Sequence, residues 1–495
     1  MVLATAAAGQ EGGAPLSAID WLSQSIEPAA IAEPAVASEI TTPQITVSPL
    51  DRPSKDRIGL LPASVTGLPP SIWSGSDEAT LVTLVQAERV ETLPAIQEFL
   101  KVLILAEADP PLGAGPDGAL FLARVDKLLD LGALEQAKSL IEAAEPDTVP
   151  LFRRWFDVAL LTGTEDQACD VVRDTPSVAP TYPARIFCLA RNGDWAAAAL
   201  TLNTHRVLGD ITEQEEALLS RFLDPELYEG EPSLEPPARV SPLMFRMHEA
   251  IGEPLITRNL PLAFAHADLR STTAWKSQIE AAERLARHGA VSENVLQQVY
   301  TARTPAASGG IWERAAAIQR FDAAMQSRDT DAIARTLSTA WNAMKQAQAE
   351  IQFAKLYGMD LIDLPLDGEA DKLAFEISLL SGDYETAALD AAGSDHDPFL
   401  MAIARGVPQE VRVTTPKELA IQAAFNGAPP PDVLQNLVAE GKLGEALLRA
   451  VALFNEGYSG DMRSVTDALA LFRSVGLEDT ARRAALQLMI LDRET

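Results

Sequence analysis

The chain has 495 residues, of which 47% are hydrophobic and only 6% aromatic, and its 70 acidic and 40 basic residues give a formal charge of −30. Such a surface repels nucleic acid and anionic lipid, so neither is expected as a direct partner, whereas a basic protein or peptide is electrostatically easier. The acidic excess can equally serve only to keep a long, Ala-rich protein soluble. Because aromatic residues are scarce, Ala and Leu must supply most of the core, which suits closely spaced helices better than a sheet sandwich.

The N-terminal part, residues 1–76, is rich in Pro, Ala, Ser and Thr and is predicted to be a disordered leader. Residues 1–8 end in small side chains, as a secretory signal does, but they lack its basic start and most of its apolar region. Either a signal peptide has been clipped here or this is simply an Ala-rich end. We favour export to the periplasm, with the cytoplasm as the alternative. No run of about 18 uncharged apolar residues occurs, so no transmembrane segment is expected.

Two apolar islands interrupt this leader, one at 19–26 around Trp21 and one at 58–73 ending in Trp73. Solvated linkers rarely need tryptophan. Either the islands dock on the protein's own helices, or Trp21 and Trp73 belong to short motifs that dock on a partner.

Helical periodicity begins near Asp77. In a first half, 77–230, it predicts three helical pairs, 119–131 with 134–144, 149–161 with 166–173, and 184–191 with 196–207. A Pro-rich acidic loop at 224–237 is expected to separate this half from a second, 238–495. There the pattern predicts long helices at 312–327 and 330–356, a hairpin of 371–380 with 385–392, and paired helices over 417–493. The final helix ends in Asp492, Arg493 and Glu494, which would suit a polar cap.

The hairpin corners share a skeleton in which Gly is followed five residues later by Ala. It occurs at Gly132, Gly163, Gly193, Gly382, Gly441 and Gly476, with separations of 31, 30, 189, 59 and 35 residues. These fit one, one, six, two and one periods of roughly 30–35, which is typical of a helical solenoid. A degenerate copy, 327–333, lies in the long gap. We expect Gly to adopt positive φ where the first helix ends, and Asp to cap the second helix at 383.

Ser-Gly-Asp-Tyr-Glu-Thr-Ala at 381–387 and Asn-Gly-Asp-Trp-Ala-Ala-Ala at 192–198 resemble the intra-repeat turn of tetratricopeptide repeats. The resemblance covers the turn and little else, and implies an α-solenoid of degenerate hairpins that binds proteins or peptides. The segments 17–22 and 59–62, with the helical repeats behind them, also resemble envelope proteins of proteobacteria, which implies no mechanism.

The two cysteines, Cys169 and Cys188, lie near the start of one predicted helix and the end of the next. Adjacent solenoid helices run antiparallel, so the two residues can meet and form a structural disulfide, or they can remain two buried thiols. No Cys-x-x-Cys occurs, so a redox site is not expected.

Motifs that carry chemistry are weak in this sequence. The residues 113–118 fit Gly-x-Gly-x-x-Gly, but a helical pattern and two prolines precede them instead of a strand, so we expect a loop and not a cofactor site. Asp395, His396 and Asp397 are three successive residues that cannot readily close around one metal ion, and we expect a helix cap before Pro398. The sequence therefore predicts no catalytic residue, no cofactor and no metal.

The tryptophans on predicted helices are Trp155, Trp195, Trp275, Trp312 and Trp341. Trp155 and Trp195 each lie beside a repeat turn, where a large side chain would fill the junction between hairpins. Core packing is the expected role, and exposure on a concave face would favour a recognition surface instead.

The sequence as a whole predicts a non-enzymatic periplasmic scaffold or adaptor that binds another protein or peptide, with a basic ligand favoured. A self-assembling structural component of the envelope is the alternative, and the oligomeric state stays open. A deep pocket that collects carboxylates and a histidine would instead favour an enzyme.

Overall fold

The structure is a computed structural model that describes residues 54–391, 393, 395–458 and 460–491. Within these residues it contains 25 α-helices and six short 3-10 helices, with no strand beyond two isolated bridges. The predicted all-helical fold class is therefore confirmed.

The helices up to residue 230 are α2 (Ala63–Thr66), α3 (Glu78–Ala87), α4 (Pro94–Leu105), α5 (Ala119–Asp130), α6 (Leu134–Ala143), α7 (Val149–Thr162), α8 (Glu165–Asp174), α9 (Tyr182–Arg191), α10 (Trp195–Leu208) and α11 (Glu213–Leu223), with the 3-10 helices η1 (Lys55–Arg57), η2 (Pro176–Val178) and η3 (Pro225–Tyr228).

The second half contains α12 (Pro242–Ala250), α13 (Ala265–Asp268), α14 (Trp275–Arg287), α15 (Glu293–Thr301), α16 (Ile311–Ser327), α17 (Thr330–Ala347), α18 (Glu350–Ile362), α19 (Gly368–Leu379), α20 (Tyr384–Asp390), α21 (Pro398–Ala404), α22 (Pro416–Phe425), α23 (Asp432–Ala439), α24 (Leu443–Tyr458), α25 (Met462–Ser474) and α26 (Glu478–Ile490). Its 3-10 helices are η4 (Thr257–Asn259), η5 (Leu262–Phe264) and η6 (Pro408–Glu410).

All six predicted turn glycines lie between two consecutive helices, and five of them are left-handed. The φ angles are 68° at Gly132, 78° at Gly163, 84° at Gly193, 76° at Gly441 and 86° at Gly476. A side chain with a Cβ is strained in this conformation, so glycine at these positions lets each helix end and the chain reverse.

Gly382 differs from this pattern and corrects the prediction for its hairpin. It is absent from the residues with positive φ, and Asp383 makes no side-chain cap to α20. The turn depends instead on Ser381, whose Oγ donates to the carbonyl of Ser378 (2.6 Å) and accepts from the backbone N–H of Asp383 (3.2 Å). The serine hydroxyl therefore forms hydrogen bonds with the Ser378 carbonyl and the Asp383 N–H, so this turn closes without a left-handed glycine.

At the degenerate copy between α16 and α17, Arg328 takes the left-handed conformation with φ of 52°. Asp329 then caps α17 by accepting a hydrogen bond from the backbone N–H of Ala332 at 3.0 Å. The same corner geometry is thus kept at this position without glycine.

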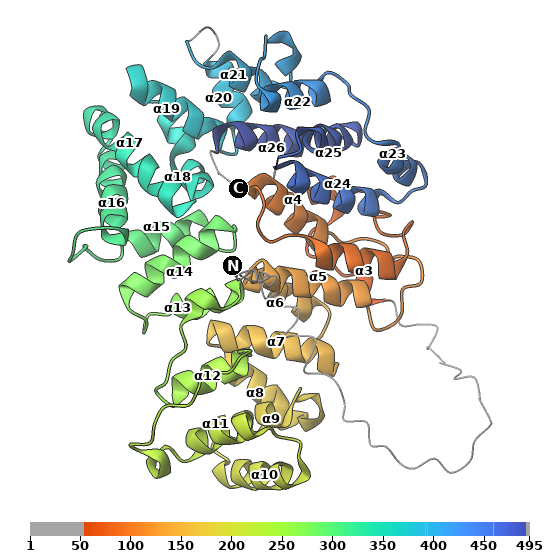
Figure 1. Ribbon diagram of the computed structural model, residues 1–495, viewed down its shortest axis with the longest axis vertical. Helices are drawn as coiled ribbons and strands as arrows, with labels where there is room; N and C mark the ends of the chain where they lie inside the picture. Colours follow the sequence, from red (N-terminus) through yellow and green to blue (C-terminus); the bar gives the residue numbers. More distant parts are fainter. Residues whose placement is uncertain (1–53, 392, 394, 459, 492–495) are drawn as a thin grey trace, which may run out of the picture.

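The described part of the chain starts in the middle of the molecule, passes through both of its ends and comes back to the middle (Figure 1). In Figure 1, α5 to α10 lead to one end, α11 to α15 return beside them, and α16 to α22 continue to the other end. The last helices come back to the first, because α26 packs on α4 and α24 packs on α3 and α4. Ala95 donates its N–H to Oε1 of Gln487 (2.7 Å), and the rings of Phe99 and Phe472 lie 5.4 Å apart.

The segment 54–76 is ordered and takes part in this closure. Trp73 is fully buried against α24, and the backbone N–H of Gly444 donates to the carbonyl of Ile72 at 2.9 Å. The predicted disordered leader is therefore wrong for residues 54–76. Of the two alternatives for Trp73, the structure shows docking on the protein's own helices and not exposure to a partner. Trp21 and residues 1–53, with the signal remnant at 1–8, lie outside the described residues.

The two predicted halves, 77–230 and 238–495, share one hydrophobic core that extends from Leu68 to Leu491. The expected boundary at 224–237 contains η3 and otherwise irregular chain, but α12 and α13 pack on α7 across it. His266 also lies with Nε2 2.7 Å from the carbonyl oxygen of Gly132.

The residues on which the expected polar cap of the last helix depends, Asp492, Arg493 and Glu494, lie outside the described residues, but the described helix α26 is largely buried. Ala481, Ala484, Ala485 and Leu486 are fully buried, and α26 packs on α4, α21 and α25. The helix that was expected to end the stack is thus an interior helix, because the first helices cover it.

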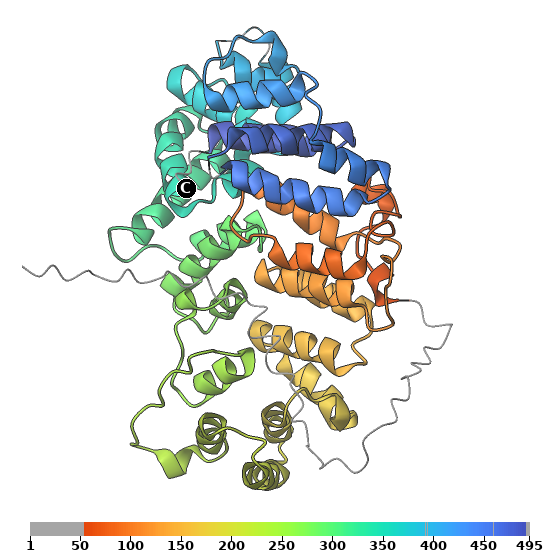
Figure 2. The same cartoon turned by 45° about the vertical axis from the view of Figure 1, so that its right-hand side comes forward.

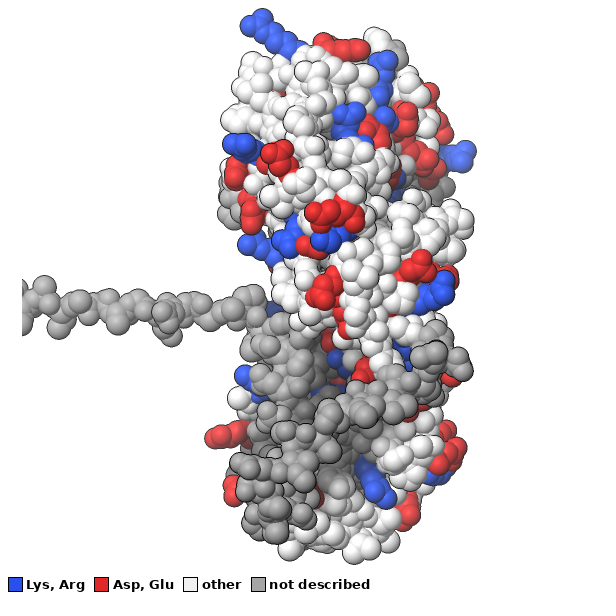
Figure 3. All heavy atoms as spheres, turned by 90° about the vertical axis from the view of Figure 1, so that its right-hand side faces the viewer, with Lys and Arg blue, Asp and Glu red and all other residues white. Residues whose placement is uncertain are grey.

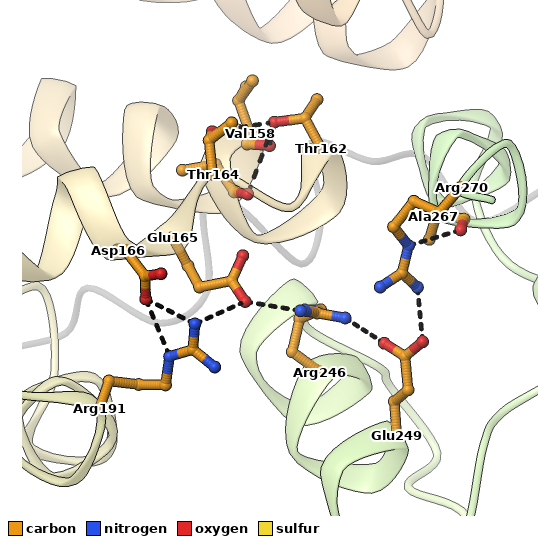
Figure 4. A network of polar contacts seen from close by, with 11 residues as sticks. Val158, Thr162, Thr164, Glu165, Asp166, Arg191, Arg246, Glu249, Ala267 and Arg270 are labelled. Atoms are coloured by element: carbon orange, nitrogen blue, oxygen red, sulfur yellow. Dashed lines mark hydrogen bonds and ion pairs between the residues drawn. The ribbon is translucent and has the colours of Figure 1, made fainter. Parts of the chain in front are cut away.

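A chain of ion pairs joins the halves next to α7 (Figure 4). Glu165 of α8, which is buried, accepts a hydrogen bond from Arg246 of α12 at 2.5 Å and lies 3.6 Å from Arg191 of α9. Arg246 also pairs with Glu249, which in turn accepts from Arg270 at 2.6 Å. Partial burial keeps these charges from full screening, so they help to fix how α12 sits on α8.

The predicted disulfide is present and joins α8 to α9. Cys169 and Cys188 are both buried, and their Cα atoms lie 4.8 Å apart. The bond closes a loop with a sequence separation of 19 residues.

Replacing both cysteines with alanine is expected to lower the local free energy of unfolding of α8 and α9 by about 3 kcal/mol, because the unfolded chain regains the entropy that the loop removed. Hydrogen exchange of the two helices would measure the loss, with α25 as an internal reference. The single variant Cys188→Ala should lose nearly as much as the double variant, since either change breaks the bond. Additive losses from the two single variants would instead point to packing.

Candidate binding surfaces

The outer face of α10 is apolar although it faces solvent. Ala196, Leu200, Asn203 and Val207 recur at intervals of four, three and four residues, so they lie on one side of the helix, and all four are exposed. The buried residues, Ala198 and Leu202, lie on the opposite side. A helix that is apolar on both sides is normally covered on both, so this outer face has the character of a contact surface.

Large apolar side chains are unusually open on this helix. The exposed fractions are 51% for Trp195, 68% for Leu200, 80% for Val207 and 65% for Leu208. The helix lies at one end of the molecule, packed on α9 and α11 (Figures 1 and 2). We call the outer side of this helix the α10 face, defined by Ala196, Leu200 and Val207, with Leu208 at its edge.

Trp195 departs from the predicted core role. Its ring approaches Phe222 at 6.4 Å but remains half exposed, whereas Trp155, Trp275 and Trp341 are buried as expected. Trp195 is the first residue of α10, just after the Gly193 turn, whereas Trp155 lies within α7, before the Gly163 turn, so the two indoles occupy different positions in their hairpins.

A second site is a cavity of about 1360 Å³ between the two runs of helices. One wall is formed by residues 86–91, after α3, with Lys127 and Asp130 of α5. The other wall is formed by residues 254–262 and by α14. This volume exceeds the roughly 300–1,000 Å³ of ordinary small-molecule pockets.

Hydrogen bonds across the base hold the two walls at a fixed spacing. Gln97 of α4 donates to the carbonyl of Val90 (2.9 Å) and lies 3.4 Å from Nδ1 of His288. Lys101 donates to the carbonyl of Gly289 at 2.7 Å, and burial lowers the pKa of this lysine to about 8. The cavity is therefore a property of the closed fold and not of either half.

Six carboxylates line the cavity, and most are held by neighbouring groups. Asp130 lies 3.3 Å from Lys127, Glu280 lies 3.7 Å from Lys276, and Glu91 lies 3.6 Å from His288. Asp268 accepts a hydrogen bond from the hydroxyl of Thr257, and Glu283 accepts hydrogen bonds from Arg314 (2.7 Å and 2.9 Å) and Tyr300 (2.7 Å). The sixth carboxylate is that of Glu88.

Glu88 is 6% exposed and its Oε2 has no hydrogen-bond partner. Burial raises the pKa of this carboxyl to about 8, and the nearby charge of Lys127 only partly offsets that rise. Glu88 is therefore mostly protonated at neutral pH. The Nζ of Lys127 instead bonds to the backbone carbonyls of Gln86 and Glu88, at 3.0 Å and 2.8 Å.

The raised pKa of Glu88 makes stability depend on pH with a definite sign. Between about pH 4.5 and 8 the folded protein keeps a proton on Glu88 that the unfolded chain releases, so the free energy of unfolding falls as pH rises, by up to about 1.4 kcal/mol per unit. Glu88→Gln is expected to remove this slope. Chemical denaturation from pH 5 to 8 would measure it, with the exposed Glu91→Gln as the matched control. A slope that persists in Glu88→Gln would contradict the assignment.

Among the residues that the structure describes, four of the six Lys and Arg residues that line the cavity make no ion pair with a carboxylate. They are Arg89, Arg258, Arg284 and Arg287. Arg284 donates to the backbone carbonyls of Thr257 and Leu260, at 2.9 Å and 2.6 Å. Burial and the neighbouring charge of Arg287 lower the pKa of Arg284, so the two guanidinium groups lie close enough to repel each other.

The sequence motifs that suggested chemistry take structural roles. Asp397 caps α21 by accepting from the N–H groups of Phe399 (2.7 Å) and Leu400 (3.2 Å), as expected. His396 stacks on Phe375 with ring centroids 4.2 Å apart. The glycines of 113–118 form the loop between α4 and α5, and the helix α4 stands where a nucleotide-binding fold would need a strand.

Across the described residues, no group of three or more His, Cys, Asp or Glu side chains could hold a metal ion. None of the helices described there has the length and apolar character needed to cross a membrane. Comparison of the chain with protein-family models, with curated proteins and with solved structures gave no match.

Sequence reasoning did not single out the cavity residues. Arg284 and Arg287 are three residues apart on α14, which places them on one side of the helix, but such spacing is common on exposed helices. The side chains of Arg89 and Arg258 belong to segments far apart in the sequence, and they meet only because the chain folds back on itself.

Proposed function

We propose that the protein is a non-enzymatic scaffold or adaptor that binds another protein, and that the α10 face is its docking surface. The observation that carries this proposal is the exposure of Leu200 and Val207, on a helix side that lacks charge in a protein with a formal charge of −30. Large exposed apolar patches commonly mark protein interfaces.

The proposed architecture is a degenerate tetratricopeptide-like solenoid whose ends have closed on each other. Its support is the series of helical hairpins with left-handed glycine corners, from Gly132 to Gly476. In such folds function lies in surfaces and not in the repeat itself, so the class implies binding but no particular partner.

The proposed compartment is the periplasm. The support is the disulfide between Cys169 and Cys188, because such bonds persist mainly in oxidising environments.

Acidic and basic side chains lie side by side over the upper part of the face in Figure 3, so the charge excess is not gathered into one acidic field there. A basic surface around an apolar centre remains the chemistry that we propose for the protein partner.

The cavity satisfies the condition under which the sequence favoured an enzyme, since it collects carboxylates and His288. Glu88, with its raised pKa, has the property of a general acid or base. Four of the other five carboxylates accept a hydrogen bond or lie within ion-pair distance of a Lys or Arg, and the fifth, Glu91, is exposed, so we favour binding over catalysis as the role of the cavity.

The test is a double substitution, Leu200→Gln with Val207→Gln, which removes the apolar stripe and keeps good helix formers. A pulldown from periplasmic extract should recover a specific protein with the unchanged chain and lose it with this variant. The matched control is Leu419→Gln with Val433→Gln, which alters two exposed apolar residues elsewhere. Equal recovery by all three proteins would contradict docking at the α10 face.

Self-assembly through the same face is the alternative, and light scattering over a range of concentrations separates the two. A mass that rises with concentration in the unchanged protein, and not in the Leu200→Gln, Val207→Gln variant, would assign the α10 face to a second copy. A constant monomer mass would favour the adaptor.

A further inference from the structure

We propose that the cavity between residues 86–91 and α14 binds an acidic polypeptide segment. This inference rests on the proposed binding function and concerns a second surface, on a different part of the molecule from the α10 face. The proposed ligand is acidic, whereas the formal charge of −30 by itself would favour a basic partner.

The first step compares the carboxylates that line the cavity with the Lys and Arg residues that line it, and asks which of them already have an ion-pair partner. The cavity lining has equal numbers of carboxylates and of Lys or Arg residues, six of each. Glu88 is protonated, and Glu283 pairs with Arg314, which lies outside the lining. Among the described residues, Arg89, Arg258, Arg284 and Arg287 make no ion pair with a carboxylate, although the charges of Glu91 and Asp268 act on Arg284. Six cationic side chains of the lining therefore face four remaining carboxylates (six less Glu88 and Glu283), so the lining has a net positive charge.

The second step is the cost of that arrangement without a ligand. Arg284 and Arg287 are partly buried, and each raises the electrostatic energy of the other. In a chain with 70 acidic residues, four unpaired arginines around one cavity are not explained by a shortage of carboxylates. An anion between them would relieve the repulsion and accept charge-assisted hydrogen bonds.

The third step is the distribution of the arginines. Arg89 lies on the segment after α3, Arg258 lies in η4 on the opposite wall, and Arg284 and Arg287 project from α14. Groups on several walls of a cavity of about 1360 Å³ suit several separate carboxylates better than one compact anion. An extended acidic chain supplies carboxylates with that spread.

The fourth step is the apolar part of the lining. Ile256 is 70% exposed at the cavity, and Leu255, Leu260 and Pro261 lie beside it. A peptide offers apolar side chains to these residues together with carboxylates for the arginines. Loops held on a rigid scaffold commonly carry such recognition, and Arg284 fixes this loop through two backbone carbonyls.

The experiment measures the fluorescence anisotropy of a fluorescein-labelled hexaglutamate peptide titrated with the full chain at pH 7 and low salt. We expect saturable binding that weakens as salt is raised, and weaker binding of a hexalysine peptide of the same length. The variant Arg89→Gln with Arg258→Gln should weaken hexaglutamate binding by about tenfold or more. Both side chains are exposed and without an ion pair, so the fold should persist.

The matched control is Arg303→Gln with Arg335→Gln, which removes two exposed arginines outside the cavity and leaves the net charge equal to that of the test variant. Its affinity for hexaglutamate should stay within about twofold of the unchanged protein, since screened distant charges contribute little. Equal losses in both variants, tighter binding of hexalysine, or an absence of saturable hexaglutamate binding would each overturn the proposal.

Competition by inorganic phosphate separates two kinds of anion site. If hexaglutamate stays bound when inorganic phosphate is added at matched ionic strength, the result supports an extended acidic segment as the ligand. Displacement of the peptide by a low concentration of phosphate would overturn the proposal in favour of a compact anion. The pulldown that tests the α10 face is independent of the peptide titration, because the variant Leu200→Gln with Val207→Gln should leave hexaglutamate binding unchanged. Failure of the cavity proposal can thus be told apart from failure of the α10 proposal.

Discussion

Trp73→Ala is expected to lower the free energy of unfolding by about 3–5 kcal/mol, one of the two largest effects that the structure predicts. The indole is fully buried where the segment 54–76 meets α24, so its removal leaves a cavity and loosens the closure of the chain. Denaturant unfolding would measure the loss, and hydrogen exchange should show faster opening of α24. The half-exposed Trp195→Ala is the control, with an expected change within about 1 kcal/mol.

Gly444→Ala tests the same closure from the opposite side. A Cβ at this position would lie 2.5 Å from Cε3 of Trp73 and 2.6 Å from the carbonyl oxygen of Ile72, and the hydrogen bond from Gly444 to Ile72 keeps the backbones together. The variant should therefore release the segment 54–76 to faster exchange. Gly115→Ala is the control, because no atom lies within 4 Å of its added Cβ. Equal exchange in both variants would contradict the packing described.

Asp126→Asn is expected to destabilise the protein by about 3–5 kcal/mol, the cost of breaking a buried ion pair by removing one charge. Asp126 accepts two hydrogen bonds from Arg154, at 2.5 Å and 2.6 Å, and both side chains are buried between α5 and α7. The change leaves Arg154 without its partner and close to Arg153. Burial already raises the pKa of the neighbouring Asp157 to about 7, so that residue cannot supply a full charge.

Asp170→Asn provides the matched control. Asp170 pairs with Arg173 at 2.6 Å, but both side chains are 55% exposed, so water screens the pair and the effect should be barely measurable. The double variant Asp126→Leu with Arg154→Met should recover much of the loss, because apolar side chains of similar size carry no desolvation cost. Equal losses in Asp126→Asn and Asp170→Asn would show that burial does not decide the strength of these pairs.

Local features of the sequence predicted most helix positions, but the single helix predicted at 330–356 is two helices, α17 and α18, separated at the left-handed Gln348. The helices on both sides of Gly132, Gly163 and Gly193 begin and end within a few residues of the predicted positions, because helical periodicity and left-handed glycine are properties of short segments. The disulfide could be foreseen for the same reason, since Cys169 and Cys188 lie on consecutive antiparallel helices.

Predictions for single residues failed where packing by another segment decided the outcome. At Gly382 a serine hydroxyl supplied the turn, and the local pattern does not distinguish that solution from a left-handed glycine. Trp155 and Trp195 both lie near a repeat turn, but Trp155 lies within α7 and is buried, whereas Trp195 opens α10, at one end of the molecule, and is half exposed.

The sequence by itself determined an all-helical chain of hairpins and five of the six glycine corners, and it placed Cys169 and Cys188 where a disulfide could form. The tertiary structure alone decided that α26 lies on α4, that Trp73 is covered by α24 and that four unpaired arginines line one cavity. The physical reason is the separation in sequence over which each kind of interaction acts. Periodicity, caps and turn glycines act within about one or two helical turns, whereas closure depends on a few contacts, such as Ala95 with Gln487, that are separated by 392 residues in the chain.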